Sequence, residues 1–196
     1  MVISIYIECY TTGMISTIIF DLYGVLREDP YLAWLKNHNL AKDGAYKVLA
    51  DEADLGNISR EEFYQQLSQI SDVAREDIEN AFSSKKSIDP QIITILTSLR
   101  PEYKLGLITN GSRHTRDFLE ESGLAPLFND IIVSSEVGLI KPDVQIFKLA
   151  LERLDSTPEE TLFIDDTKQN VLAAEALGIK AVQYESLDQF QALLNK

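Results

Sequence analysis

Acidic side chains end two of the apolar runs of this chain, at positions where carboxylates can do chemistry. Asp21 ends the run in IIFDLYGVL, and Asp165 and Asp166 end the run in LFIDDTKQN, with Asn170 four residues after Asp166. A buried strand that ends in a carboxylate carries it to the sheet edge where ligands of open α/β proteins bind. Adjacent carboxylates at a buried strand end repel each other, so we expect a cation there. Hard oxygen ligands of this kind suit Mg²⁺ better than zinc or iron.

Two further runs are followed by side chains that could hold an anion. Thr109, Asn110 and Gly111 follow one run in LGLITNGS, beside a helix that is predicted to begin near Ser112. Helix amino termini bind anions through their free N–H groups. Lys141 follows another run, in GLIKPDVQIF. Each residue also has a plain structural explanation, Ser112 as a helix cap and Lys141 as a solvated surface cation.

The elements that must position these side chains follow from an alternation of short apolar runs with amphipathic stretches. This pattern predicts an α/β fold, a doubly wound parallel sheet with helices on both faces. The predicted strands are Ile15–Leu22, Leu105–Asn110, Ile131–Ser135, Thr161–Asp165 and Ile179–Tyr184. The predicted helices between them are Pro90–Arg100, Ser112–Gly123, Asp143–Leu154 and Lys168–Leu177.

One segment interrupts the alternation and reads as an all-helical insertion after the first strand. The predicted domains are a core of residues 14–27 and 88–196, a helical cap of residues 28–87, and an amino-terminal extension of residues 1–13. The predicted cap helices are Tyr31–Asn39, Ala41–Leu55, Ser59–Ile70 and Asp72–Phe82, and Ser59 with Glu62 fits a capping box. An insertion that leaves from the end of the first strand would roof the ligand crevice.

Composition limits the classes of protein to which the chain can belong. Its 196 residues, 45% of them apolar, suffice for one domain that carries a small insertion. The net charge of −13 repels nucleic acid and anionic membranes, so we expect neither as a partner. The single cysteine, Cys9, excludes an internal disulfide, so we expect a cytoplasmic protein. We also expect a monomer or a small homo-oligomer.

Taken in chain order, these residues form the series Asp, Thr, Lys, Asp-Asp, each at the end of a different predicted strand. From Met14 onward the chain resembles the haloacid dehalogenase superfamily of hydrolases. The helical insertion, with LGNISREEF, KPDVQIF and FIDDTKQN, resembles the phosphatase-like branch (subfamily IA) with a type 1 helical cap. The resemblance implies a Rossmann-like core and the activity of a Mg²⁺-dependent hydrolase.

The resemblance also implies a role for each residue of the series. Asp21 would be the nucleophile, and Thr109 and Lys141 would act with it in catalysis. The implied phosphate-binding residues are Thr109, Asn110, Gly111 and Lys141. The implied metal ligands are Asp21, the backbone carbonyl of Tyr23 and Asp166, with Asp165 or Asn170 acting directly or through water.

Tyr23 departs from the phosphatase pattern, which carries a proton-donating aspartate two residues after the nucleophile. We expect a phosphatase of a small phosphorylated metabolite, such as a sugar phosphate, that works through an aspartyl-phosphate on Asp21. One alternative is a metal-independent 2-haloacid dehalogenase, a family that also has tyrosine at this position. The acidic pair Asp165 and Asp166 argues against it, as does Phe147, where such dehalogenases carry an aromatic hydroxyl. Another alternative is a binding or regulatory protein with little or no turnover.

Overall fold

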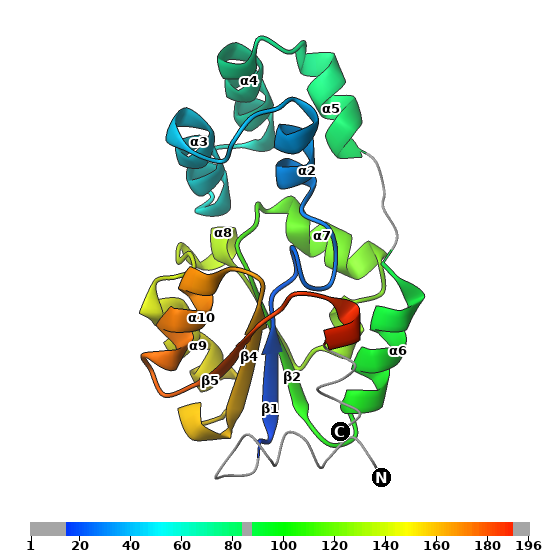
Figure 1. Cartoon of the computed structure of the whole chain (residues 1–196), viewed down its shortest axis with the longest axis vertical. Coiled ribbons are helices and arrows are strands. Elements are labelled where there is room, and N and C mark those ends of the chain that lie inside the picture. The colour runs from blue at the N-terminus through cyan, green and yellow to red at the C-terminus, as the bar shows by residue number, and fades with distance from the viewer. Residues whose placement is uncertain (1–14, 84–87, 190–196) are drawn as a thin grey trace.

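A five-stranded parallel sheet forms the centre of the molecule. The computed structural model describes residues 15–83 and 88–189, so the predicted extension of residues 1–13 lies outside the described residues. The strands are β1 (Thr17–Phe20), β2 (Lys104–Thr109), β3 (Asp130–Val133), β4 (Thr161–Asp165) and β5 (Lys180–Gln183). They are arranged in the order β3-β2-β1-β4-β5, with β1 in the middle (Figure 1). The predicted doubly wound α/β fold is confirmed.

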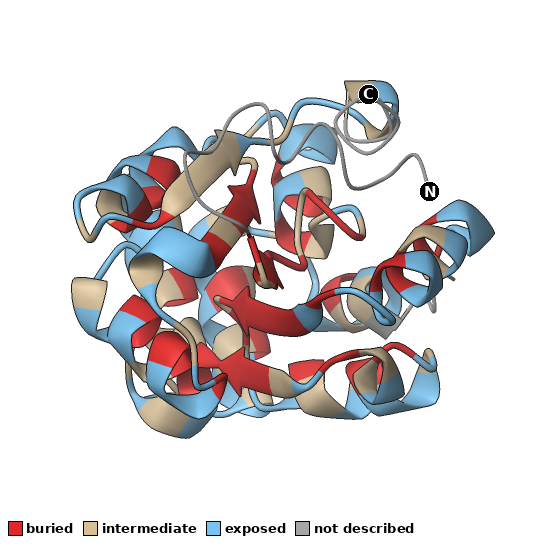
Figure 2. Cartoon of the chain, turned by 90° about the horizontal axis from the view of Figure 1, so that it is seen from below, coloured by how far each residue is buried: buried red, intermediate tan, exposed pale blue. Residues whose placement is uncertain are grey.

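Helices cover both faces of the sheet, which explains why the central strands are continuously apolar. Helices α6 (Pro90–Leu99) and α7 (His114–Glu121) pack on one face, and α9 (Val144–Arg153) and α10 (Lys168–Glu175) pack on the other. All four residues of β1 are buried, and the surrounding helices are exposed on their outward sides (Figure 2). Two short 3₁₀ turns, Ala125–Leu127 and Pro158–Glu160, precede β3 and β4.

The register of the sheet aligns the ends of its three central strands. Thr17 of β1 lies opposite Lys104 of β2 and Thr161 of β4. Parallel strands in register end at the same edge, so the residues that follow Phe20, Thr109 and Ile164 come together there.

Some predicted boundaries differ from the structure. The strand predicted over Ile131–Ser135 ends at Val133, and a short helix, α8 (Ser134–Val137), begins at once. The pairing with β2 ends at Thr109 and Val133, and the Ser134 hydroxyl bonds Gly111 in the loop after β2 instead. Ser112 is not a helix cap, because α7 begins at His114 with Arg113 at the cap position.

The predicted helical insertion forms a compact group above the carboxyl ends of the strands (Figure 1). Its helices are α2 (Pro30–Asn37), α3 (Gly44–Asp54), α4 (Arg60–Ser71) and α5 (Arg75–Ser83), which share a separate apolar core. We call these helices and their connections the cap. The capping box of Ser59 and Glu62 is present at the start of α4. Within the described ranges, no helix is long and apolar enough to cross a membrane.

Candidate active site

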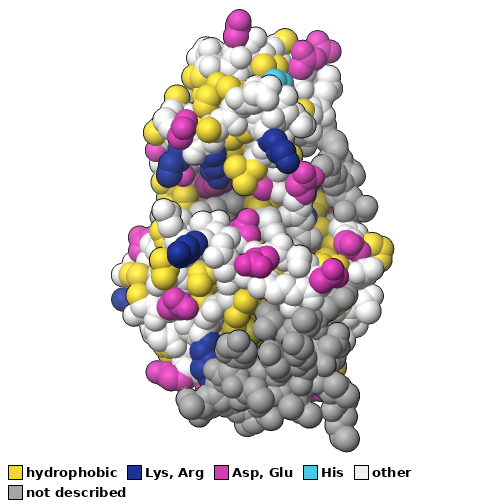
Figure 3. Space-filling view, viewed as in Figure 1, with side chains coloured by type: hydrophobic (Ala, Val, Ile, Leu, Met, Phe, Trp, Pro, Cys, Tyr) yellow, Lys and Arg dark blue, Asp and Glu magenta, His cyan; other side chains and the backbone are white. Residues whose placement is uncertain are grey.

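A cavity of about 800 Å³ lies between the cap and the carboxyl edge of the sheet. Core residues Asp21, Lys141 and Asp166 line it from below, and cap residues that include Tyr31 and Arg60 line it from above. In Figure 3 basic side chains gather along the edge of the cap that faces this hollow. A smaller cavity of about 490 Å³ nearby reaches none of the three core residues, so the larger cavity is the candidate site.

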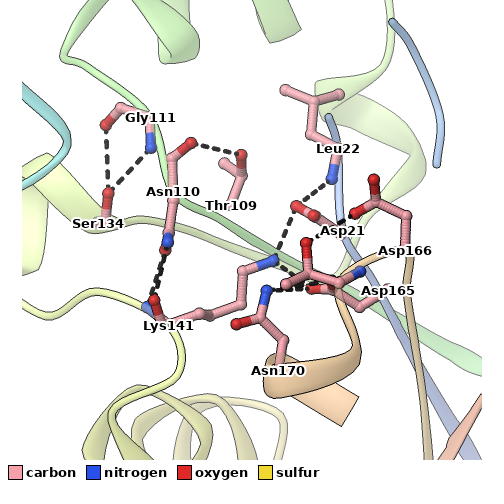
Figure 4. Close-up of polar contacts among 11 residues, drawn as sticks. Asp21, Leu22, Thr109, Asn110, Gly111, Ser134, Lys141, Asp165, Asp166 and Asn170 are labelled. Carbon is pink, nitrogen blue, oxygen red and sulfur yellow. Dashed lines mark hydrogen bonds and ion pairs between the residues drawn. The ribbon is translucent and has the colours of Figure 1, made fainter. Parts of the chain in front are cut away.

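Lys141 joins two carboxylates at the floor of this cavity (Figure 4). Its Nζ lies 2.8 Å from Asp21 Oδ1 and 2.7 Å from Asp165 Oδ2. The side chains of Lys141 and Asp165 are 1% and 0% exposed. Asp21 Oδ1 also accepts a 2.7 Å hydrogen bond from the backbone N–H of Leu22. The lysine is therefore held by ion pairs in a site that excludes most water.

Asp165 and Asp166 have different surroundings although they are adjacent in the chain. Asp165 accepts hydrogen bonds from Asn170 Nδ2 at 3.1 and 3.0 Å and from the Thr167 N–H at 2.8 Å, in addition to Lys141. Its oxygens are occupied by protein donors. Asp166 instead lines the cavity and accepts a 3.2 Å bond from the Thr167 hydroxyl. Asp166 is thus the carboxylate of the pair that is open to the cavity.

Gly24 allows the Asp166 carboxylate to approach the loop after β1. Its φ is +86°, and a Cβ at this position would collide with the Asp166 carboxylate. Oxygen atoms of Asp21, Asp165 and Asp166 all lie within 4.8 Å of one another. A glycine is required here for the backbone conformation and for the space that the carboxylate occupies.

Burial changes the acid–base properties of these carboxyl groups. Burial and the nearby Asp165 raise the pKa of Asp21 to about 8, against the opposing effect of Lys141. Burial and Asp165 also raise the pKa of Asp166. Burial alone would lower the pKa of Lys141, but Asp21 and Asp165 raise it above its usual value. The lysine therefore stays charged, but its single positive charge does not offset the effect of burial on the carboxyl pKa values.

The residues at the end of β2 divide between the cavity wall and the supporting structure behind it. Asn110 lines the cavity, but its amide group bonds the Lys141 backbone, with Nδ2 3.0 Å from Lys141 O and Oδ1 2.8 Å from Lys141 N. The Gly111 N–H donates to Ser134 Oγ at 2.9 Å. Thr109 is fully buried, with its hydroxyl 3.4 Å from the Asn110 carbonyl. In this arrangement Asn110 fixes the position of Lys141.

Tyr23 directs its hydroxyl toward helix α7. The hydroxyl lies 3.2 Å from Thr115 Oγ1, and burial raises the pKa of the phenol to about 12. The Arg27 guanidinium lies 5.6 Å from the centre of the Tyr23 ring and 3.9 Å from that of Phe118. A phenol with this pKa holds its proton tightly near neutral pH and is a weak acid.

Sequence reasoning assigned no role to three residues of the cavity region. Arg27 and Asp54 line the cavity, and Ser134 bonds the carbonyl of Asp54. Asp54 is one of several acidic residues in DEADLGN, and nothing in this pattern distinguishes it from its neighbours.

The parallel sheet, the carboxylate at the end of its central strand and the cap define an α/β protein with a roofed polar cavity at the carboxyl edge of the sheet. The family model of haloacid dehalogenase-like hydrolases matches residues 15–178. The chain therefore belongs to the haloacid dehalogenase-like hydrolases.

Solved structures agree with this assignment. A predicted hydrolase of the same family from Porphyromonas gingivalis is 28% identical, with a TM-score of 0.71, over 94% of this chain and 100% of that one. A family enzyme from Bacteroides thetaiotaomicron in a magnesium complex is 22% identical, with a TM-score of 0.75, over 94% and 100% of the two chains. At that identity the second similarity shows the fold alone.

Curated relatives match shorter stretches. A glyceraldehyde 3-phosphate phosphatase from Methanocaldococcus jannaschii is 35% identical over 97 residues, which are 48% of this chain and 42% of that protein. The matched stretches span less than half the length of the first curated relatives.

Proposed function

We propose that the protein is a Mg²⁺-dependent phosphatase of a small phosphorylated metabolite, with Asp21 as its nucleophile. The observation that carries this proposal is the cluster of Asp21, Asp165 and Asp166 within 4.8 Å beside the buried Lys141. Phosphoryl transfer depends mainly on positioning and charge neutralisation. A lysine supplies positive charge for phosphoryl oxygens, and a carboxylate cluster suits a divalent cation.

The residues present fit Mg²⁺. Burial raises the pKa values of Asp21 and Asp166, so a cation beside them would favour their charged forms, and their donors are hard oxygen atoms. Asp21, Asp166 and the backbone carbonyl of Tyr23 would hold the ion, and Asp165 and Asn170 would support it directly or through water. When bound, the ion would act as a Lewis acid toward phosphoryl oxygens. The magnesium complex of the Bacteroides thetaiotaomicron enzyme supports this assignment.

The reaction we infer has two steps. The Asp21 carboxylate attacks phosphorus to form an aspartyl-phosphate, and the bond from phosphorus to the leaving oxygen breaks. Water then attacks phosphorus, releases phosphate and restores the carboxylate. Lys141 would bind and orient the phosphoryl group, with Asn110 and Gly111 beside it on the cavity wall and Thr109 buried behind them. Asn110 does so by holding the Lys141 backbone, through the two hydrogen bonds described above.

The size of the cavity and one relative support a small metabolite as the substrate. A volume of about 800 Å³ is ample for a sugar phosphate. The relative from Methanocaldococcus jannaschii is a phosphatase of a three-carbon sugar phosphate by its name.

The test is release of phosphate and of halide from parallel panels. The panels hold sugar phosphates, an aryl phosphate and short 2-haloacids, each with Mg²⁺ or EDTA. We expect phosphate release that requires Mg²⁺ and falls by at least about 10³-fold in Asp21→Asn, because an amide cannot be the nucleophile. Halide release that EDTA does not affect would replace the proposal with a dehalogenase. Absence of release in both panels would favour a binding protein.

A further inference from the structure

Among the described residues of the loop after β1, the residue two positions after Asp21 is a tyrosine, where the phosphatase pattern has a proton-donating aspartate. The hydroxyl of Tyr23, at the position of the usual acid, bonds Thr115 Oγ1 at 3.2 Å, and its pKa is about 12. An ester with a poor leaving group needs a proton on the departing oxygen. In an in-line displacement the leaving oxygen lies opposite the attacking carboxylate. Asp21 is on the floor of the cavity, so the leaving oxygen faces the cap.

Asp54 stands where the cap meets the core. It is the last residue of α3, whose lower end lies above α8 in Figure 1. The Ser134 hydroxyl donates to the Asp54 carbonyl and receives a 2.9 Å hydrogen bond from the Gly111 N–H. Two residues later, a Cβ on Gly56 would lie 2.8 Å from the Ser135 carbonyl oxygen. This close packing fixes the backbone of Asp54 relative to the core.

Asp54 lines the same cavity as Asp21 and Lys141. Among the described residues, none donates a hydrogen bond to its carboxyl group. Burial raises its pKa to about 7, as do Asp29 and Asp51, while Lys42 and Lys141 oppose the change. The phenols of Tyr23 and Tyr31 are the other titratable groups that it influences. Near neutral pH a large fraction of Asp54 therefore carries a proton.

We propose that Asp54 is the general acid and base of the reaction, supplied by the cap in place of the missing aspartate. The inference rests on the proposed phosphatase function. In the first step the Asp54 carboxyl gives its proton to the leaving oxygen as that oxygen parts from phosphorus. In the second step the resulting carboxylate takes a proton from the water that attacks phosphorus. Each turnover thus returns Asp54 to its protonated form.

The test compares leaving groups in Asp54→Asn and the wild-type protein with Mg²⁺ present. An alkyl phosphate has a poor leaving group, whereas 4-nitrophenyl phosphate has one that departs without a proton. We expect kcat to fall by about 10²-fold or more for the alkyl ester and by less than about threefold for the aryl ester. The matched control is Glu52→Gln, because Glu52 lies on the same helix and does not line the cavity. We expect it to retain both activities.

Two further readouts separate proton transfer from a structural effect. In Asp54→Ala, added formate should restore part of the alkyl phosphate activity, because a small carboxylic acid can enter the space of the lost side chain. With the alkyl ester, we expect wild-type kcat/KM to fall above about pH 7, where Asp54 loses its proton. This fall should be absent in Asp54→Asn.

The outcomes distinguish this inference from the proposed function. Equal losses for both esters, or no loss for either, would refute the role of Asp54 and leave the phosphatase intact. A wild-type protein that releases no phosphate from any ester would refute the phosphatase, and the inference would fall with it.

Discussion

Lys141 holds together the most highly charged part of the core. Its ammonium group contacts both Asp21 and Asp165 at a depth where side chains are almost fully excluded from water. Removal of one partner from such a group leaves the others as uncompensated buried charges, which is far costlier than removal of a surface ion pair. The residue that neutralises substrate charge in our proposal is therefore also a major determinant of stability.

We predict that Lys141→Met abolishes activity and lowers the free energy of unfolding at pH 7 by about 3 kcal/mol. The physical reason is that Asp21 and Asp165 remain buried without their cation. Urea unfolding at pH 7 measures the change. Lys148→Met, on the exposed side of α9, is the control and should change stability by less than about 0.5 kcal/mol. A loss below about 1 kcal/mol for Lys141→Met would mean that the carboxylates find other partners.

For single residues, the sequence predicted the location of a side chain well where that residue lies at the end of a strand. Asp21, Thr109 and Asp165 each directly follow or end an apolar run, and parallel strands in register carry them to one edge. Lys141 was expected there as well, and the structure brings its ammonium group to Asp21. Asp54 could not be predicted, because its place depends on how the end of α3 packs against α8. That contact joins segments 80 residues apart and leaves no local pattern.

At the scale of elements, α8 links the cap to the core. The Ser134 hydroxyl bonds the Asp54 carbonyl from the cap, and the Gly111 N–H from the core bonds the same hydroxyl. The neighbouring Ser135 hydroxyl is also buried, but no described group bonds it. We therefore expect that loss of the Ser134 hydroxyl weakens the contact between α3 and the core, whereas loss of the Ser135 hydroxyl does not.

We predict that Ser134→Ala destabilises the protein by about 1–2 kcal/mol, because it leaves a buried carbonyl and a buried N–H without partners. Hydrogen exchange should show faster exchange at the end of α3, which loses its anchor on the core. Ser135→Ala is the matched control and should leave stability unchanged or slightly higher, since it removes an unbonded buried hydroxyl. Equal effects of the two variants would contradict a role for Ser134 in anchoring the cap.

The sequence predicted the strands and most helices, because their hydrophobic periods are strong. It did not predict α8, which has only four residues and no periodic pattern of its own. It also began the second cap helix at Ala41, whereas α3 begins at Gly44. The Asp43 side chain makes no cap hydrogen bond, so local capping chemistry gave no clear signal for this boundary.

For the whole molecule, the pKa shifts make stability depend on pH. The pKa of Asp21 is raised from 3.8 to about 8 and that of Asp54 from 3.8 to about 7. Between these limits the folded chain binds more protons than the unfolded chain, so stability falls as pH rises. The net charge of −13 acts in the same direction, because repulsion among carboxylates grows as they ionise. Lys141 stays protonated over this range, since its pKa is raised.

We therefore predict that in EDTA the urea midpoint falls steadily from pH 5 to pH 8, and that millimolar Mg²⁺ reduces the fall. A divalent cation that binds only the folded carboxylate cluster competes with protons there and stabilises the fold by mass action. Its effect should be largest at pH 8, where protons compete least with the ion for Asp21. Asp166→Asn should lose most of this gain, because it removes the carboxylate that is open to the cavity. An equal effect of Mg²⁺ on wild type and Asp166→Asn would mean that the ion acts by general screening.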